Sequence, residues 1–306
     1  MIRSPAWRKF FHDKWGMASL VVVLLYLFTA IGMEIYSRRC SRENVVPVYQ
    51  LSSPEGSYAR PSLRHPLGTD YQGRDVLWRT AAGTAGALKT GLIAGLIAAG
   101  IGVFLGMVSG FFGGKTDETV VWLFSTFASM PTLLFILAFA LLMGPDYLSP
   151  SGNAILKKIA GAINVEPGML GVYLAIGLTG WVTLCKVVRA ETMKLRIMPY
   201  ISAAKVAGVG NLTILRRHIL PNVFHLVIIY FTTLFAGAVM LEVIVSYLGL
   251  GAQSAPSWGI MIADGQNRLW AGVWWEITAA STALLILVLA LNILGDALRD
   301  ALDPRR

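Results

Sequence analysis

The sequence predicts an all-α membrane protein with about six transmembrane helices, and three observations lead to this fold class. Of the 306 residues, 55% are hydrophobic and only 14% are charged, and the mean hydropathy is +0.62. Soluble domains carry roughly 25% charged residues. The apolar residues form long runs, and basic residues flank those runs. Such runs are typical of helices that cross a bilayer and not of half-buried surfaces in a soluble domain.

Six apolar runs are long enough, or nearly so, to cross a bilayer. The first follows a basic N-terminus and has no small-residue cleavage site after it, so we expect a retained helix and not a cleaved signal peptide. The predicted first helix covers residues 17–36. The other predicted spans are residues 88–112, 120–143, 170–188, 223–247 and 277–298.

The distribution of Lys and Arg predicts that both termini lie in the cytoplasm. On this topology, residues 37–87 form an external connector that is basic, rich in Pro and Ser, and too poor in apolar residues for a core of its own. The connector is an exception to the charge rule, but its length weakens the rule there. The remaining predicted parts are a cytoplasmic N-terminus (1–16), a five-helix transmembrane core (88–298) that contains a cytoplasmic loop (189–222), and a cytoplasmic tail (299–306).

The composition also excludes several kinds of protein and site. The net charge of +9 is compatible with a nucleic-acid binder, but basic residues beside apolar runs favour membrane topology, so no nucleic-acid partner is expected. Cys40 and Cys185 lie in different settings, and we predict neither a disulfide nor a metal site between them. The four histidines lack metal-ligand spacing, because Pro221 separates the nearest pair, His218 and His225, and a third ligand is missing.

A phosphate-binding loop is also excluded. The segment from Gly110 to Thr116 superficially resembles GxxxxGK[ST], but Ser109 occupies the position of the first required glycine, and a helix of bilayer length precedes it where the motif needs a strand. No catalytic motif is present either. We therefore expect no bound cofactor and no enzymatic activity in this chain.

Two features within the predicted spans have more than one interpretation. Glycines four residues apart in the second span, such as Gly102, Gly106 and Gly110, permit close helix packing, and a moving gate is the alternative. Glu242 is the one acid clearly inside a span. An ionisable group at membrane depth is costly, so Glu242 either pairs with a backbone group or neighbouring helix, or lies near a translocation path.

The loop 189–222 is the most informative segment. It is too polar to cross a bilayer, and its pattern predicts one short helix over residues 200–207, a break at Gly208 and Gly210, and a second helix over 212–219 before Pro221. A short helix pair held at the membrane surface suits docking of a cytosolic partner. The small side chains of Ala203, Ala204 and Ala207 would allow that partner to approach closely.

This loop resembles the EAA signature of ABC importer permeases. The matching residues are Ser202, Ala203, Ala204, Gly208, Ile219, Leu220, Pro221 and Asn222. Three further motifs resemble the dipeptide, oligopeptide and nickel branch of that family: His65 to Asp70 with Gly73 to Val76, Ser246 to Gly251 with Pro256 to Gly259, and Leu294 to Asp296 with Leu302 to Arg305. One departure is Ser202, where the family usually has glutamate, and we expect altered coupling there and not its loss.

The resemblance implies the type I ABC importer transmembrane fold and a permease subunit for peptides in the bacterial inner membrane. It implies a heterodimer with a second permease, two cytosolic subunits that use ATP and Mg²⁺, and an external solute-binding protein. The residues implied to couple this chain to its ATPases are Ser202, Ala203, Ala204, Gly208, Arg216, His218, Leu220 and Pro221. Nickel or another small solute is an alternative cargo, and an ion-coupled secondary transporter is an alternative class, disfavoured because neither internal repeats nor several intramembrane charges are visible.

Overall fold

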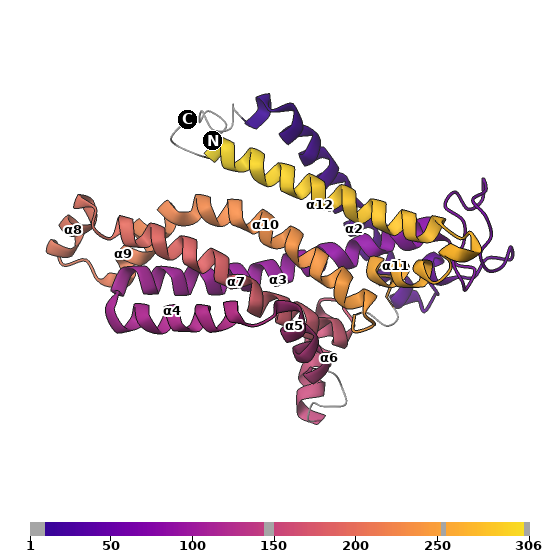
Figure 1. Cartoon of the computed structure of the whole chain (residues 1–306), viewed down its shortest axis with the longest axis horizontal. Coiled ribbons are helices and arrows are strands. Elements are labelled where there is room, and N and C mark those ends of the chain that lie inside the picture. The colour runs from indigo at the N-terminus through magenta and orange to yellow at the C-terminus, as the bar shows by residue number, and fades with distance from the viewer. Residues whose placement is uncertain (1–9, 144–149, 252–254, 303–306) are drawn as a thin grey trace.

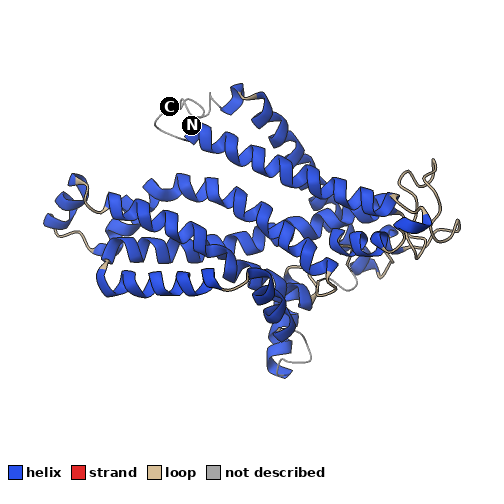
Figure 2. Cartoon of the chain, in the orientation of Figure 1, coloured by secondary structure: helices blue, strands red, loops and turns tan. Residues whose placement is uncertain are grey.

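The computed structural model describes residues 10–143, 150–251 and 255–302. The basic N-terminal residues Arg3, Arg8 and Lys9, and the motif residues Asp303, Pro304 and Arg305, lie outside this part of the chain. The described residues are predominantly helical and form no β-strand beyond two isolated bridges. Figure 2 shows helices joined by loops throughout. The structure confirms the predicted fold class.

Five helices are long and apolar enough to cross a membrane. They are α2 (Lys14–Glu43), α3 (Val76–Phe112), α7 (Pro167–Leu195), α10 (Leu220–Tyr247) and α12 (Trp275–Leu302). In Figure 1, α3, α7 and α10 run along the long axis of the molecule, and α2 and α12 lie together beside them. The start of α2 and the end of α12 both lie toward the side of the bundle that carries α8 and α9.

The predicted span 120–143 is not one straight helix. It is divided into α4 (Gly114–Ser129) and α5 (Thr132–Leu142), which meet at an angle of 91°. The break falls at Met130, whose φ of −82° and ψ of 137° are extended, and at Pro131. Proline disfavours the helical conformation of the residue before it and cannot donate an N–H itself, so this dipeptide interrupts the helix. The sixth span exists only if the bent pair crosses as one unit.

The first two membrane helices are longer than their apolar runs. Helix α2 ends at Glu43, where Asn44 adopts a left-handed conformation, and α3 begins at Val76, after the Asp75 carboxylate caps its first turn. The predicted connector 37–87 therefore shrinks to residues 44–75, which include the short 3₁₀ helix η1 (Val48–Gln50). Apolar runs mark only part of each helix, and the ends are set by local backbone and capping groups, Asn44 for α2 and Asp75 for α3.

The connector is ordered by polar contacts and not by a hydrophobic core of its own. Asp70 is fully buried and pairs with Arg74 at 2.6 Å and with Arg79. His65 Nδ1 lies 2.7 Å from the Asp75 carboxylate that caps α3, and the Trp275 indole of α12 donates to the Thr69 carbonyl at 2.9 Å. The first family-like motif thus joins the connector to α3 and α12.

Small residues let α3 pack closely against its neighbours. A Cβ atom on Gly106 would lie 2.7 Å from the Cys185 carbonyl oxygen of α7, and Gly102 and Gly110 meet the same helix at similar distances. Gly91, by contrast, faces the Phe235 ring of α10. Close packing is therefore what these glycines do in this structure, on two faces of α3.

Three further elements connect the long helices. Helix α6 (Pro150–Ala162) precedes α7, and α11 (Trp258–Gln266) with the short η3 (Leu269–Ala271) lies between α10 and α12. Trp258 is 1% exposed, and its indole ring packs directly against Gly83 of α3. The indole N–H donates to the Thr80 carbonyl at 2.9 Å. This contact fixes α11 against the first turns of α3.

Candidate functional site

The loop between α7 and α10 folds into two short helices, α8 (Pro199–Val206) and α9 (Asn211–Ile214). We name residues 196–219 the α8–α9 loop. Pro199 occupies the first turn of α8, a position that tolerates a missing N–H. Gly208 has a φ of +79°, a left-handed conformation that ends α8 and reverses the chain. The predicted helix, break and helix are confirmed.

The second helix continues into the membrane without a break, which the sequence did not predict. A π-helical segment, η2 (Leu215–Ile219), joins α9 to α10, and the Leu220 N–H bonds to the Leu215 carbonyl. Pro221 cannot donate an N–H and would clash with the carbonyl four residues earlier, and a π-turn relieves this conflict. The Asn222 side-chain amide donates to the His218 carbonyl at 2.6 Å. Pro221 therefore shapes a continuous rod instead of starting a new helix.

The α8–α9 loop stands on a buried apolar base. Ile201, Ile214 and Ile219 are each 0% exposed, and they pack with Leu184 and Val188 of α7. Burying each such side chain stabilises by about 1.5–3 kcal/mol, so the loop is held firmly to the bundle.

Ionic contacts also attach this end of α7 to the rest of the bundle. Arg189 forms two bonds of 2.6 Å to the Asp117 carboxylate of α4, and Arg196 donates to the Gly110 carbonyl at 3.2 Å. A bidentate guanidinium–carboxylate pair fixes orientation as well as distance. The base of the loop is thereby tied to the turn between α3 and α4.

The tip of the loop is exposed and apolar. Val206 is 90% exposed and Leu212 is 80% exposed, and each lies on a different short helix. Exposed apolar groups on a rigid element mark surfaces that bind another protein. Sequence reasoning singled out the small residues of the loop and missed these two, although both are apolar positions in a segment too polar to cross a membrane.

The predicted coupling residues do not all share one surface. On α8 and its end, Ser202, Ala203 and Gly208 are exposed and Ala204 is half-buried. Arg216 and Pro221 are exposed, whereas His218 and Leu220 are half-buried. The centroid of the His218 ring in η2 lies 6.3 Å from that of the Tyr200 ring in α8. Arg216 has no ion pair within the described part of the chain.

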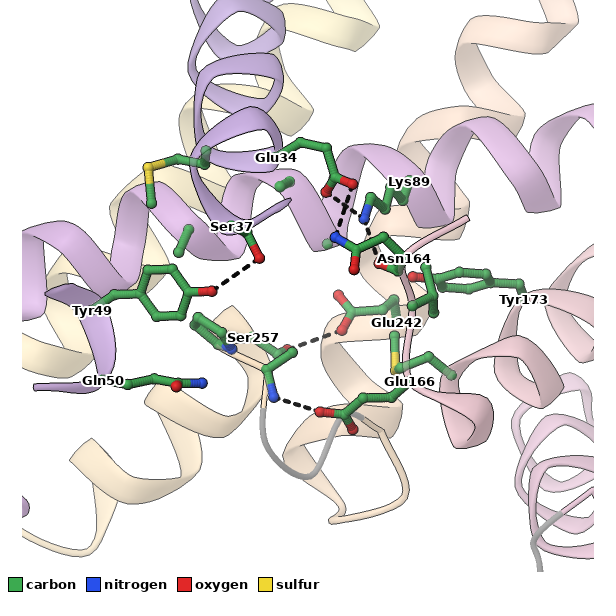
Figure 3. A pocket seen from close by; sticks show the side chains of 18 of the residues that line it. Glu34, Ser37, Tyr49, Gln50, Lys89, Asn164, Glu166, Tyr173, Glu242 and Ser257 are labelled. Atoms are coloured by element: carbon green, nitrogen blue, oxygen red, sulfur yellow. Dashed lines mark hydrogen bonds and ion pairs between the residues drawn. The ribbon is translucent and has the colours of Figure 1, made fainter. Parts of the chain in front are cut away.

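Glu242, the other predicted site residue, lies near the C-terminal end of α10, away from the α8–α9 loop that precedes the helix. It is 2% exposed and accepts hydrogen bonds from Ser246 at 2.7 Å and Ser257 at 2.9 Å. It also lines a cavity of about 430 Å³, which we name the connector pocket. Figure 3 shows its carboxylate facing that cavity.

Glu242 is not the only ionisable group within the long helices, and this corrects the sequence interpretation. Glu34 of α2 pairs with Lys89 of α3 at 2.6 Å, and both line the connector pocket. Lys89 falls at the start of the predicted span 88–112 and was not singled out there, but α3 begins at Val76, so Lys89 lies well inside the helix. The signal for this pair was present in the sequence: an acidic residue, Glu34, lies in one apolar run, and a basic residue, Lys89, lies at the edge of the next.

Tyr49 is an ionisable side chain of the pocket that lies outside the spans. Tyr49 of η1 is 8% exposed, and burial raises the pKa of its phenol above the ordinary value. Its hydroxyl therefore stays neutral at physiological pH and lies 3.4 Å from the Ser37 hydroxyl.

Known proteins with similar sequences include transport subunits. Residues 102–306 match the family model described as "Binding-protein-dependent transport system inner membrane component". The dipeptide transport system permease protein DppC of Bacillus subtilis (strain 168) is 31% identical over 304 residues, covering 99% of this chain and 85% of the relative. The oligopeptide transport system permease protein OppC of Escherichia coli (strain K12) is 31% identical over 303 residues, covering 99% and 91%.

A solved structure with a similar fold comes from the MetNI methionine ABC transporter in inward-facing conformations. The TM-score is 0.51 with 16% sequence identity, and the match covers 74% of this chain and 98% of that chain. At this identity the likeness concerns the fold. Together with the apolar helices and the family match, it shows that the chain is a multi-pass membrane protein and belongs to the binding-protein-dependent transport system inner membrane components, among the permease subunits of the dipeptide and oligopeptide ABC importers.

Proposed function

We propose that this chain carries peptides inward across the bacterial cytoplasmic membrane as one half of a permease heterodimer. Two cytosolic subunits supply the free energy by binding and hydrolysing ATP with Mg²⁺, and an external solute-binding protein delivers the peptide. Both termini and the α8–α9 loop lie in the cytoplasm on this proposal. The curated relatives whose names state dipeptide and oligopeptide transport support the choice of cargo.

The observation that carries the proposal is the construction of the α8–α9 loop. Its apolar base is fully buried and its tip exposes Val206 and Leu212. A partner can shift a conformational equilibrium only by binding the two states differently, and a firmly attached loop passes that difference into the helices. Ser202, Ala203, Gly208 and Arg216 are exposed, so an ATPase subunit would have access to them.

Introducing negative charge into the apolar tip tests this proposal. The double change Val206→Asp and Leu212→Asp removes the exposed apolar contacts without touching the buried base. We expect the ATPase subunits to be lost from the purified complex and ATP-driven peptide uptake into proteoliposomes to fall to background. The matched control is Leu63→Asp, a fully exposed leucine of the connector, which leaves both unchanged.

Two outcomes would contradict the proposal. Uptake that continues in ATP-depleted vesicles under an ion gradient would identify a secondary transporter. Stable ATPase binding to the double variant would place the docking surface elsewhere. A complex that transports nickel or another small solute, and no peptide, would retain the mechanism and overturn the cargo.

Ser202 tests the electrostatics of the same face. It is exposed on α8, one helical turn before Lys205, whose ammonium lies 4.9 Å from the centre of the Phe111 ring. Ser202→Glu restores the charge that is usual in the family and places it within reach of Lys205. We expect a changed rate of transport-coupled ATP hydrolysis with an unchanged fold. An unchanged rate would mean that charge at this position plays no part in coupling.

A further inference from the structure

The connector pocket is formed by segments from across the sequence. It lies between the second half of α2, the 3₁₀ helix η1, the first turns of α3, the start of α7, the end of α10 and residues 255–257. Its volume of about 430 Å³ falls in the range of sites for small molecules, about 300–1,000 Å³. Gln50, Gly161 and Ala255 at its edge are exposed, so the cavity is reached from the connector end of the bundle.

Acidic side chains outnumber basic ones among the described residues that line the pocket. Three carboxylates, Glu34, Glu166 and Glu242, face one ammonium group, Lys89. The ammonium is already engaged, because Lys89 pairs with Glu34 at 2.6 Å and donates to the Asn164 carbonyl at 2.7 Å. Figure 3 shows this group along one wall of the cavity. Lys89 therefore does not neutralise the other two carboxylates through a direct contact.

Neighbouring hydroxyl groups orient Glu242 through only one of its two carboxylate oxygens. Both serine hydroxyls, from Ser246 and Ser257, donate to the same carboxylate oxygen, Oε1. The second oxygen, Oε2, receives no hydrogen bond from any described residue, and the carboxylate faces the cavity (Figure 3). A carboxylate that is 2% exposed is costly unless a cation or a donor compensates it.

The rest of the wall suits a small cationic group. Glu166 lies at the edge, where it accepts the Ala255 N–H at 2.6 Å. The buried rings of Tyr49 and Tyr173 supply aromatic surface, which attracts cations as well as apolar groups. An ammonium group has three donors in a compact volume. It is therefore small enough to enter the cavity and reach the Glu242 carboxylate, whereas the surface of a partner protein is not.

We propose that the connector pocket binds the protonated amino group of the peptide substrate, with Glu242 as its main partner. This inference rests on the proposed function and names the part of the peptide that this subunit recognises. Glu166 lies at the entrance and Glu242 at the depth of the cavity. The ion pair between Glu34 and Lys89 forms one wall, and Lys89 disfavours an anionic group at the same place.

Thiol labelling with charged reagents tests whether the electrostatic potential in the pocket favours cations. Gln50→Cys is introduced at the edge of the cavity, in a background with the buried Cys40 and Cys185 changed to Ala, and the whole transporter complex is reconstituted in nanodiscs. The cysteine is treated with a cationic and an anionic methanethiosulfonate reagent of similar size. We expect the cationic reagent to react faster, and adding Glu242→Gln to reduce the ratio of the two rates by about tenfold.

Two controls separate this effect from a general change. Glu43→Gln removes an exposed carboxylate from the end of α2, outside the pocket, and leaves the ratio unchanged. Ser246→Ala removes a hydrogen bond to Glu242 without removing charge, and it changes the ratio less than Glu242→Gln does.

Protection by ligand identifies what the pocket binds. Without the solute-binding protein, dialanine slows labelling of Gln50→Cys, whereas N-acetyl-dialanine at the same concentration does not. Glu242→Gln abolishes the protection. Equal protection by both peptides, or equal rates for both reagents, would overturn the inference. Protection by the solute-binding protein alone would also overturn it and assign the pocket to a protein contact. ATP-driven uptake of peptide is measured separately, so failure of the proposed function remains distinguishable.

Discussion

The two ends of this bundle are stabilised in opposite ways. At one end, the α8–α9 loop has an isoleucine-rich base and an exposed apolar tip. At the other end, the connector and its pocket are organised by buried polar contacts, such as the ion pair of Asp70 with Arg79 and the hydrogen bonds of Glu242. Apolar contacts are non-directional and tolerate the sliding of one surface on another. Buried ionic contacts demand a specific geometry, so the comparison teaches that one end suits a protein partner and the other a defined chemical group.

Removal of Asp70 gives the largest expected effect, because it breaks the ionic end at its centre. Asp70→Ala leaves Arg79, which is 4% exposed, without its carboxylate partner. Removing one member of a buried ion pair costs about 3–5 kcal/mol. We expect a marked loss of thermal stability in detergent, measured by tryptophan fluorescence. The control is Glu55→Ala, which removes the 3.7 Å contact with the exposed Arg64 and changes stability by less than about 1 kcal/mol.

Close helix packing between the two ends gives the next largest effect. Gly106→Ala places a Cβ atom 2.7 Å from the Cys185 carbonyl of α7, whereas Gly100 of the same helix has nothing within 4 Å. Overpacking costs about 1–3 kcal/mol. Gly106→Ala therefore lowers the unfolding temperature, and Gly100→Ala leaves it unchanged or raises it. Equal effects from the two changes would show that α3 and α7 separate easily.

The ion pair at the loop end is a smaller test of the comparison. Asp117→Asn weakens the bidentate contact with Arg189, which ties α7 to α4. Since the apolar base of the loop remains, we expect only about 1–2 kcal/mol of local destabilisation. Hydrogen exchange in residues 196–219 becomes faster while the melting temperature changes little. Glu191→Gln, which removes an exposed pair with Lys194, is the control and leaves exchange unchanged.

The smallest expected effect is a change of pH dependence at the connector end. Burial raises the pKa of Asp264 in α11 above its ordinary value, and its Oδ2 has no hydrogen-bond partner among the described residues. Arg79 and Arg74 oppose this shift and Asp70 adds to it. Between the unfolded and folded pKa values the native state binds more protons, so the carboxyl lowers stability as the pH rises.

Asp264→Asn removes that titration. The variant should gain stability relative to wild type above the raised pKa and lose the advantage at acidic pH. The measurement is the difference in unfolding temperature between about pH 4 and about pH 8. A wild-type difference that the variant reproduces would show that Asp264 does not titrate in this range.

The fold class and the loop pattern could be predicted because they depend on local signals. Apolar runs predicted the membrane helices, and Gly208 with its neighbours predicted the break between α8 and α9. The bend at Met130 and Pro131 had a visible cause, but a proline is also common in unbroken membrane helices, so the sequence did not decide it. The π-helical segment before Pro221 likewise depends on how the helix accommodates a missing N–H.

The same distinction between local signals and tertiary contacts applies to the candidate site residues. Exposure of Ser202 and Ala203 followed from a loop too polar to cross a bilayer. The connector pocket joins Glu34, Lys89 and Glu242 from three helices, and no local pattern says which distant charges meet. Glu242 was identified because a lone acid in an apolar run is unusual, whereas its serine partners gave no signal of their own.

The π-helical joint between α9 and α10 has a mechanical consequence. Because Leu215–Ile219 continues into α10 without a break, the segment from Leu215 to Glu242 is one stiff lever, about 40 Å long at 1.5 Å per residue. A tilt of about 5° at its foot swings the far end through about 3 Å, comparable to the length of a hydrogen bond. Motion imposed on the loop can thus open or close contacts around the Glu242 carboxylate near the other end of α10, with no break in the helix between them.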